Sequence, residues 1–324
     1  MASTELEIGM FEKATAIVNP VSSNSAKGRR RLDRIAMKAP FEIEIVETSK
    51  FTDKNNGLIR YALENSDVVM VVAGDGTFNQ VVNTILSNDV SDKAQNVPLW
   101  SIGGGNADDG SKASHTKLYF RHPERILDKD KIRVIDAYPI MSKVINPFTN
   151  ETEQYAAAFY ASFGMSASAA SEQYINNPKY RRLFGKFALG RVLSEPVLIA
   201  RAAWDTSDNT VYREGDETQT FYEQIFANSS IMAKAFHFPT ALAKQEIFHA
   251  TIDHKHNLLS AVVQARRGRL DGEYMYEEDV YSFTTAHDLM AQFDGEAIKI
   301  PPNRSVSIWQ HDQPIKLVVT RPDL

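Results

Sequence analysis

The chain has 324 residues, of which 43% are hydrophobic and 24% are charged, and its formal net charge is −5. This length and composition predict a folded protein with a sizeable core and room for two domains, and they exclude wholesale disorder. The absence of cysteine excludes disulfides, thiolate zinc sites and cysteine nucleophiles. Because the overall charge balance is acidic, we expect no nucleic-acid partner.

No apolar run reaches the length of about 20 residues that a membrane-spanning helix needs, because charged residues interrupt every run. The first nine residues carry Glu5 and Glu7 and no basic residue, so they lack the pattern of a signal peptide. We therefore expect a cytoplasmic protein. If its substrate is a lipid, it must visit the membrane surface as a peripheral protein.

Residues 10–131 alternate between strand and helix patterns, which is typical of a doubly wound parallel sheet. Runs of β-branched residues and helical spacing of apolar residues mark the elements. Strands are expected over residues 14–18, 41–47, 68–72 and 98–102, and helices over residues 25–36, 54–64 and 78–86. The fold class is therefore predicted to be α/β.

From residue 132 the pattern becomes rich in strands, which predicts a second, sheet-based domain. Strands are expected over residues 133–138, 155–162, 219–228, 247–252 and 306–309, and one helix over residues 178–192. Residues 180–189 mix cations with large apolar side chains. That composition suits docking at a membrane surface, and it suits equally a helix packed on its sheet.

Segment 73–79, which reads Ala-Gly-Asp-Gly-Thr-Phe-Asn, joins a predicted strand to a predicted helix. Glycines before a helix expose backbone N–H groups beside the positive end of the helix dipole, and phosphate is the anion usually bound there. Asp75 would repel a phosphate, so it indicates a metal ion or a proton acceptor beside the phosphates. Asn19-Pro20-x-Ser22 and residues 103–105 follow two other strands. Because ligands of such sheets bind beyond the carboxyl ends of the strands, the three turns are expected to form one site.

Four segments together resemble motifs of the diacylglycerol kinase catalytic family, which includes bacterial lipid kinases and sphingosine and ceramide kinases. Segment 19–22 resembles its Asn-Pro-x-Ser, and segment 73–79 its Gly-Gly-Asp-Gly-Thr-x-Asn. Segment 102–106 resembles its Leu-Gly-Thr-Gly-Asn, and segment 294–296 its Asp-Gly-Glu. The four occur in the family's order. The resemblance therefore extends over most of the chain.

The resemblance implies an α/β nucleotide-binding domain over residues 10–131 and a β-sandwich domain for the lipid substrate over residues 132–311. The tail, residues 312–324, is expected to return to the first domain through a strand over residues 315–320. The implied activity is an ATP-dependent lipid kinase that phosphorylates a hydroxyl of a diacylglycerol-like or sphingoid-like lipid. Mg²⁺ would bridge the phosphates of ATP.

The resemblance also implies roles for single residues. Glu296 would be the general base that takes the proton from the acceptor hydroxyl, whose own pKa is far above neutral. Asp75 would serve the phosphate–magnesium region and is the second catalytic residue. The expected nucleotide contacts, besides Asp75, are Asn19, Pro20, Ser22, Thr48, Ala73, Gly74, Gly76, Thr77, Asn79, Gly103, Gly104, Gly105 and Asn106.

The chain departs from the family pattern in several places. Ala73 stands where the family usually has its first glycine, and Gly104 where it commonly has threonine. Ser166 replaces an acidic residue of the family's Gly-Phe-Asp-Ala. Segment 239–246 lacks the acidic cluster that holds a structural magnesium in many bacterial members. Because Mg²⁺ needs oxygen anions, that structural site is expected to be absent or rebuilt.

Two other functions stay open. An NAD kinase-type enzyme shares the Gly-Asp-Gly loop, although Phe78-Asn79 after Thr77 fits it poorly. A non-catalytic lipid- or nucleotide-binding protein would explain the departures at 73 and 104, but it would need neither Asp75 nor Glu296. An Asp-Gly-Glu sequence alone is typical of a hairpin turn. The sequence also leaves open whether the chain forms a homodimer.

Overall fold

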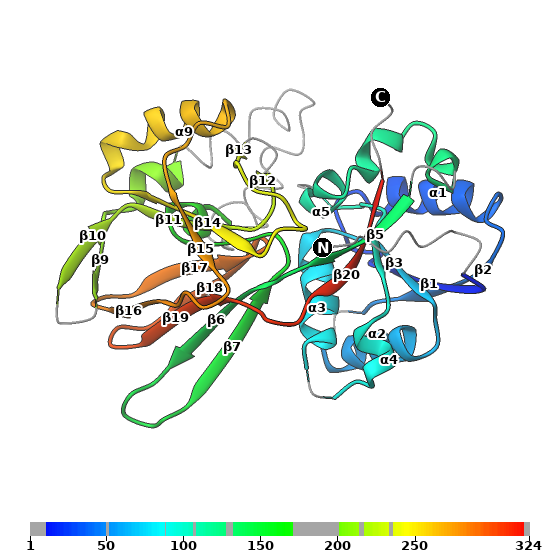
Figure 1. Cartoon of the computed structure of the whole chain (residues 1–324), viewed down its shortest axis with the longest axis horizontal. Helices are drawn as coiled ribbons and strands as arrows, with labels where there is room; N and C mark the ends of the chain where they lie inside the picture. The colour runs from blue at the N-terminus through cyan, green and yellow to red at the C-terminus, as the bar shows by residue number, and fades with distance from the viewer. Residues whose placement is uncertain are drawn as a thin grey trace.

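The computed structural model describes residues 11–49, 52–87, 89–105, 108–127, 132–170, 201–213, 217–232 and 236–320. The predicted helix over residues 178–192, segment 180–189 within it, and Asn106 lie outside the described residues. Figure 1 shows two lobes side by side, with the last strand of the chain returning to the lobe that holds the first. Within the described residues, no helix combines the length and apolar character that crossing a membrane requires.

The first lobe is built on a six-stranded sheet with the order β2-β1-β3-β4-β20-β5. The strands are β1 (Lys13–Val18), β2 (Glu42–Glu47), β3 (Val68–Val72), β4 (Leu99–Ser101), β5 (Ile132–Ala137) and β20 (Ile315–Thr320). The first four and β20 run parallel, and β5 is antiparallel to β20. All five residues of β3 are buried, as expected for an unbroken apolar strand covered on both faces.

Helices cover both faces of this sheet (Figure 1). They are α1 (Ser25–Ala36), α2 (Thr52–Glu64), α3 (Asp75–Ile85), α4 (Asp92–Gln95) and α5 (Asp109–Ala113). Leu32 of α1 belongs to one buried cluster with Met70. Ile59 of α2 and Val81 of α3 belong to another with Val71. Because Met70 and Val71 are neighbours on one strand, the two clusters lie on opposite faces, which confirms the doubly wound α/β prediction.

The second lobe contains two six-stranded antiparallel sheets, with orders β10-β9-β16-β19-β6-β7 and β15-β14-β11-β8-β17-β18. The first sheet consists of β6 (Ile140–Ile145), β7 (Thr152–Ala157), β9 (Asn209–Tyr212), β10 (Thr218–Phe221), β16 (Tyr281–Thr285) and β19 (Ser305–Gln310). The second consists of β8 (Tyr160–Gly164), β11 (Glu223–Ala227), β14 (Glu246–Ile252), β15 (Glu273–Tyr276), β17 (Leu289–Phe293) and β18 (Glu296–Ile300). One apolar cluster takes side chains from both sheets, including Phe163 and Phe283, so they form the predicted β-sandwich.

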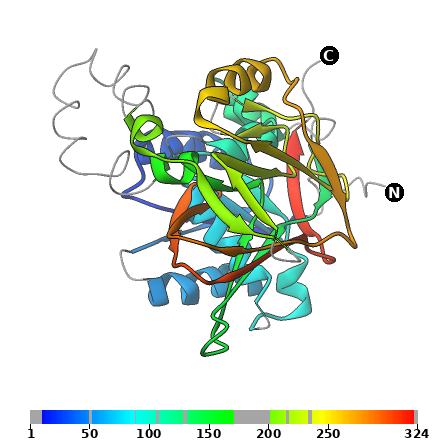
Figure 2. The ribbon, with the colours of Figure 1, turned by 90° about the vertical axis from the view of Figure 1, so that its left-hand side faces the viewer.

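The smaller elements of this lobe are a two-stranded hairpin, β12 (Ile231–Met232) with β13 (Phe236–His237), and the helices α6 (Met165–Ala170) and α9 (Leu258–Arg266). Figure 2, which looks at this lobe end on, shows α9 along its upper edge. Short 3₁₀ turns occur at η2 (Thr116–Tyr119), η3 (Pro123–Leu127) and η5 (Lys255–Asn257).

Three sequence expectations need correction. The predicted strand over residues 133–138 is β5 and belongs to the first sheet, so that sheet does not end at residue 131. The predicted strands over residues 155–162 and 219–228 are each two strands, separated by turns. The helix predicted to begin at residue 78 begins at Asp75, so the Asp-Gly-Thr sequence forms its first turn.

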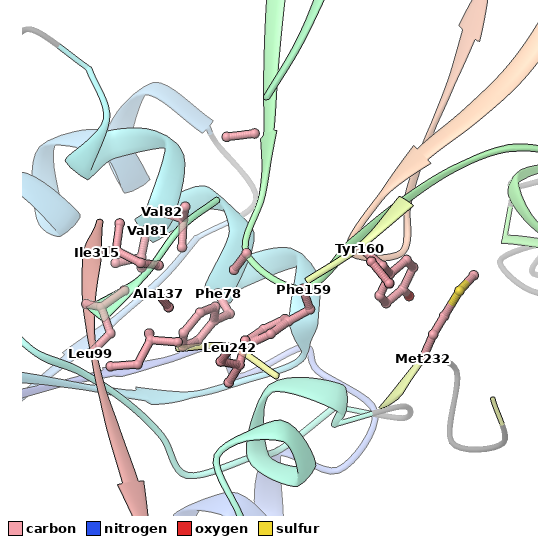
Figure 3. Packing of buried hydrophobic residues seen from close by; sticks show 14 of the residues in the cluster. Phe78, Val81, Val82, Leu99, Ala137, Phe159, Tyr160, Met232, Leu242 and Ile315 are labelled. Carbon is pink, nitrogen blue, oxygen red and sulfur yellow. The ribbon is translucent and has the colours of Figure 1, made fainter. Parts of the chain in front are cut away.

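The two lobes share a buried cluster that surrounds the start of α3 (Figure 3). Phe78 of α3 lies against Phe159, which follows β7, with ring centroids 5.2 Å apart. Leu242 and Tyr160 from the second lobe belong to the same cluster. This packing fixes the first turn of α3 relative to the β17–β18 hairpin, which carries Asp294 and Glu296.

Candidate active site

The turns after the parallel strands meet at one edge of the first sheet, as the strand directions require. Asn19 follows β1, Thr48 follows β2, Gly74 follows β3 and Gly103 lies two residues beyond β4. The turn after β1 binds the turn after β4 directly, because Ser22 Oγ donates a hydrogen bond to the carbonyl oxygen of Gly104 at 2.7 Å. The structure thus brings together segments that are more than eighty residues apart.

The polar side chains after β1 link both glycine turns. Asn19 Nδ2 donates to Thr77 Oγ1 at 3.0 Å, which ties this turn to the start of α3. Asn24 Nδ2 donates to the carbonyl oxygen of Gly105 at 2.7 Å. Sequence reasoning missed Asn24, whose only signal was its position just before a predicted helix.

The two glycine turns are in close contact with each other. A Cβ atom at Gly105 would lie 2.3 Å from Gly74 Cα, and one at Gly104 would lie 3.2 Å from the backbone nitrogen of Ala73. Gly103 has a φ of +72°, in the left-handed region that favours glycine. Glycine at position 104 therefore permits a backbone approach that the family's threonine would hinder in this turn. Ala73 itself is not among the residues with positive φ.

Asp108 occupies the inner side of the second glycine turn. Its Oδ1 accepts hydrogen bonds from the backbone N–H groups of Gly104 at 2.9 Å and Gly105 at 2.7 Å. Asp108 stands at the N-cap position of α5 with a φ of 53°, but its side chain does not cap that helix. Two N–H groups that the glycine pattern offers to a phosphate are thus bonded to a carboxylate of the chain itself.

Asp75 lies in the first turn of α3 and reaches α5. Its Oδ1 accepts a hydrogen bond from the backbone N–H of Gly110 at 3.1 Å. Burial, together with the neighbouring carboxylates of Asp109 and Asp108, raises the pKa of Asp75 to about 7, against the opposing effect of the N–H donors. Asp109 is itself fully buried and forms an ion pair with Lys112 at 2.6 Å.

Glu296 comes from the second lobe and meets the start of α3. It follows the turn between β17 and β18, in which Asp294 and Gly295 both have positive φ, the pattern of a type I′ hairpin. A Cβ atom at Gly76 would lie 2.6 Å from Glu296 Oε1, so glycine at this position leaves room for the carboxylate. Although Glu296 remains solvent-accessible, partial loss of solvent around its carboxyl group raises its pKa. The carboxylate therefore lies against the helix turn that also carries Asp75.

Asp294 and Asn79 connect the two lobes through a hydrogen bond. The Asp294 carboxylate is fully buried and accepts hydrogen bonds from the backbone N–H groups of Ala158 at 2.6 Å and of Phe159 and Tyr160 at 3.0 Å each. Asn79 Nδ2 donates to Asp294 Oδ2 at 3.2 Å. Burial raises the pKa of Asp294 to about 6, against the effect of these four donors. The Asp-Gly-Glu sequence thus has two parts, a buried anchor and an accessible carboxylate.

The other predicted nucleotide contacts have different positions. Asn79 is buried, and its side chain also donates to the carbonyl oxygen of Ala156 at 2.5 Å, so it points to the lobe interface. Thr48 is buried at the end of β2, where its backbone N–H donates to the carbonyl oxygen of Val18. Pro20 is exposed in the turn after β1.

Tyr160 is a residue of this region that sequence reasoning missed. Its ring is buried in the shared cluster, and its hydroxyl is 3.7 Å from where a Cβ of Gly295 would be (Figure 3). Burial raises the pKa of Tyr160 well above its ordinary value, and the nearby charges of Asp109, Asp75 and Asp294 add to this. The sequence holds no signal for it, because a tyrosine in a strand is an ordinary core residue.

The carboxylates suit a magnesium ion that is held jointly with phosphates. Within the described residues, no three His, Asp or Glu side chains are grouped to hold a metal by themselves. Mg²⁺ usually keeps several waters and takes one or two carboxylates together with substrate phosphates. Asp75, with Asp109 close enough to raise its pKa, offers such oxygen donors, and a cation there would relieve their repulsion. In segment 239–246 the one carboxylate, Glu246, lies 2.8 Å from Lys244 Nζ.

Comparison with known proteins finds a family match for the first part of the chain. Residues 13–140 match the family model of the diacylglycerol kinase catalytic domain. A diacylglycerol kinase of Staphylococcus saprophyticus is 32% identical over 108 residues, which are 33% of this chain and 34% of the relative. One of Staphylococcus aureus strain JH9 is also 32% identical over 108 residues, 33% of each chain. The chain therefore aligns with about a third of the length of these curated relatives.

Solved structures resemble the chain over nearly its whole length. A crystal structure of a diacylglycerol kinase from Bacillus anthracis has a TM-score of 0.65 and 14% identity, covering 97% of this chain and 98% of that one. Yeast NADH kinase complexed with NADH has a TM-score of 0.53 and 9% identity, covering 96% of this chain and 84% of that one. At such identities the likeness shows the fold alone, and it is a fold that both kinds of kinase share.

Proposed function

Residues 13–140 match the family model of the diacylglycerol kinase catalytic domain, and from this premise we propose that the chain is an ATP-dependent lipid kinase. Its acceptor would be a hydroxyl of a diacylglycerol-like or sphingoid-like lipid. The observation that carries the proposal is the position of Glu296, whose carboxylate lies against Gly76 in the first turn of α3. A carboxylate from one lobe thus faces the proposed phosphate-binding turn of the other.

The first turn of α3 is the proposed site of the transferred phosphate. Gly74 at the N-cap has no side chain with which to cap the helix, so the first N–H groups are left for a ligand. The helix dipole adds partial positive charge at the same place. Asn19 and Thr77, which are hydrogen-bonded to each other, border this turn and support its geometry.

Phosphoryl transfer needs positioning and charge neutralisation more than covalent chemistry from the protein. When bound, magnesium would neutralise phosphate charge beside Asp75. Glu296 would accept the proton of the acceptor hydroxyl as its oxygen forms a bond to the γ-phosphorus and ADP leaves. The raised pKa of Glu296 favours this role, because a base works best when its pKa approaches the working pH.

The test is phosphate transfer from magnesium-ATP by the whole chain to a panel of acceptors: diacylglycerol, a sphingoid base, a polyprenol and NAD. Transfer to a lipid hydroxyl supports the proposal, whereas transfer to NAD alone would assign the chain to NAD kinase-type activity. Nucleotide or lipid binding without any transfer would favour a non-catalytic binding protein.

Glu296→Gln tests the proposed base. The amide is nearly isosteric and does not accept the proton, so we expect turnover to fall by ~10²-fold or more with little change in ATP affinity. Parallel loss of ATP binding would instead make Glu296 a metal or nucleotide ligand. Unchanged turnover and binding would leave the Asp-Gly-Glu sequence as a turn only.

A further inference from the structure

Helix α9 carries apolar side chains on the face that points away from the protein. Ala261 and Ala265 are buried and belong to the large apolar cluster that the two lobes share. Leu259 is 76% exposed and Val263 41% exposed. Positions 259 and 263 lie one turn apart and on the opposite side of the helix from 261 and 265. A surface helix ordinarily places polar residues on that side.

Trp204 extends this apolar face beyond the helix. It is 79% exposed, and Lys255 Nζ lies 5.3 Å from the centroid of its ring. Lys255 precedes Leu259 by one turn, so the indole, the ammonium and the two aliphatic side chains follow one another. The α9 surface consists of Trp204, Lys255, Leu259, Val263, Arg266 and Arg267.

The charge of this region is opposite to that of the whole chain. Residues 258–270 contain three arginines and no acidic residue, whereas the chain has a net charge of −5. Among the acidic residues nearby, Asp208 lies 3.2 Å from His254 Nδ1 and accepts a hydrogen bond from the backbone of Lys255. Asp205 lies 3.5 Å from Arg201. Asp253 and Asp271 lie in the sequence on either side of residues 258–270.

We propose that the α9 surface docks the chain on an anionic lipid bilayer. Apolar side chains flanked by lysine and arginine are what an interfacial helix presents to the boundary between headgroups and acyl chains. The exposed indole suits the same boundary, since one part of it is apolar and its N–H is polar. α9 lies on the outer edge of the second lobe in both views, so a planar surface can approach it (Figures 1 and 2).

The proposal deepens the proposed function, because an insoluble acceptor lipid must be reached at a bilayer. Docking through the second lobe would hold the lobe that carries Glu296 at the surface. It rests on the charge and apolar character of the described side chains and does not involve residues 180–189. A second copy of this chain is the alternative occupant, and the test distinguishes it from a bilayer.

The experiment measures co-sedimentation of the whole chain with vesicles of phosphatidylcholine alone and of phosphatidylcholine with phosphatidylglycerol. We expect binding to the anionic vesicles and a loss of about tenfold or more in the Leu259→Ser/Val263→Ser double variant. Arg266→Gln/Arg267→Gln should weaken binding and reduce its salt dependence. Matched controls are Met37→Ser and Phe148→Ser, which change side chains 74% and 79% exposed elsewhere and should leave binding unchanged.

Three results would overturn the proposal: no binding to anionic vesicles, equal binding to phosphatidylcholine alone, or equal loss in the Phe148→Ser control. Sedimentation equilibrium adds a fourth, since dimerisation that the double variant abolishes would make a second copy the occupant. The measurements therefore decide between the bilayer and a second copy of this chain.

Transfer to a short-chain, water-soluble acceptor separates this inference from the proposed function. We expect the Leu259→Ser/Val263→Ser variant to retain that turnover and to lose turnover on vesicles. Vesicle binding that depends on the α9 surface, without transfer to any lipid, would sustain docking and defeat the kinase proposal. Transfer to vesicle lipid that is unaffected by the double variant would sustain the kinase and defeat docking.

Discussion

After β3 the chain enters α3 through Gly74 and Asp75, and the first turn of this helix faces Glu296 from the other lobe. After β4 the chain turns through Gly104 and Gly105, and both of their N–H groups are bonded to Asp108. The two turns have similar sequences and lie side by side at the ends of neighbouring strands. One is left open to a ligand, and the other is already bonded to an anion of the chain.

This difference shows what glycine-rich turns do and do not specify. Glycine permits a close approach of the backbone, but the approaching group need not be a phosphate. At Gly105 it is the Cα of Gly74, and at the N–H groups of Gly104 and Gly105 it is the Asp108 carboxylate. A glycine pattern therefore predicts where the backbone is accessible, and only the structure shows which group uses it.

Asp75→Asn is the strongest test of the first turn. We expect it to abolish measurable phosphoryl transfer, because the variant loses the charge that would hold magnesium beside the phosphates. The fold should persist, since asparagine can still accept the N–H of Gly110 and cap α5. Turnover and the free energy of unfolding are measured together. Normal turnover in the folded variant would remove Asp75 from the catalytic site.

Gly105→Ala tests the contact between the two turns. A Cβ atom there would lie 2.3 Å from Gly74 Cα, backbone against backbone, so the turns must move apart at a cost of about 1–3 kcal/mol. Gly57→Ala is the matched control, because no atom lies within 4 Å of its Cβ position in α2. That control should gain roughly 0.5–1 kcal/mol. Denaturant unfolding that gives equal effects for the two variants would contradict the close packing.

The pH dependence of stability tests the cluster around Asp75. Its pKa in the folded protein is raised to about 7, above that of an ordinary aspartate. The protonated form therefore favours the folded state, and this contribution is lost as the pH rises from about 4 through about 7. Without nucleotide or metal, the wild type should lose ~1–2 kcal/mol relative to Asp75→Asn between pH 5 and pH 7. A difference that stays constant with pH would show that Asp75 titrates normally.

Much of the fold follows from sequence periodicity. The bounds of α1 and β3 agree with the predicted ones, because an amphipathic helix and a run of β-branched residues are strong local signals. The strand over residues 155–162 failed for the opposite reason. Its break at Ala158 and Phe159 contains no glycine or proline. The backbone N–H groups of these two residues donate to the carboxylate of Asp294, which is far away in the sequence.

Site residues could be predicted from the sequence where a motif contains them. They could not be predicted where their role depends on a hydrogen-bond partner that is distant in the sequence. Segment 73–79 and Glu296 could be selected from the sequence, and the structure brings them together. The role of Asp294 as a buried anchor, with Asn79 as its partner, depends on contacts across the lobe interface. Asp108 is the first of two successive aspartates in the sequence. No sequence pattern indicates that its carboxylate accepts hydrogen bonds from the glycine turn that precedes it.

Asp108→Asn tests whether the negative charge at the second glycine turn affects nucleotide binding. Asparagine Oδ1 can still accept both N–H groups, and asparagine tolerates the left-handed φ of 53° well, so the turn should keep its shape. Only the negative charge is removed. If ATP phosphates lie near this turn, relief of like-charge repulsion should raise magnesium-ATP affinity about fivefold, an effect that shrinks at high salt.

Calorimetric titration with magnesium-ATP at low and high salt measures that affinity, and Asp108→Ala separates charge from geometry. Alanine removes the charge and both hydrogen bonds, so it should loosen the turn and lose part of the gain. Unchanged affinity in Asp108→Asn would mean that the nucleotide does not approach the second turn. Lower affinity would mean that the carboxylate binds the nucleotide's magnesium, in which case the second turn is part of the site through Asp108 and not through its glycines.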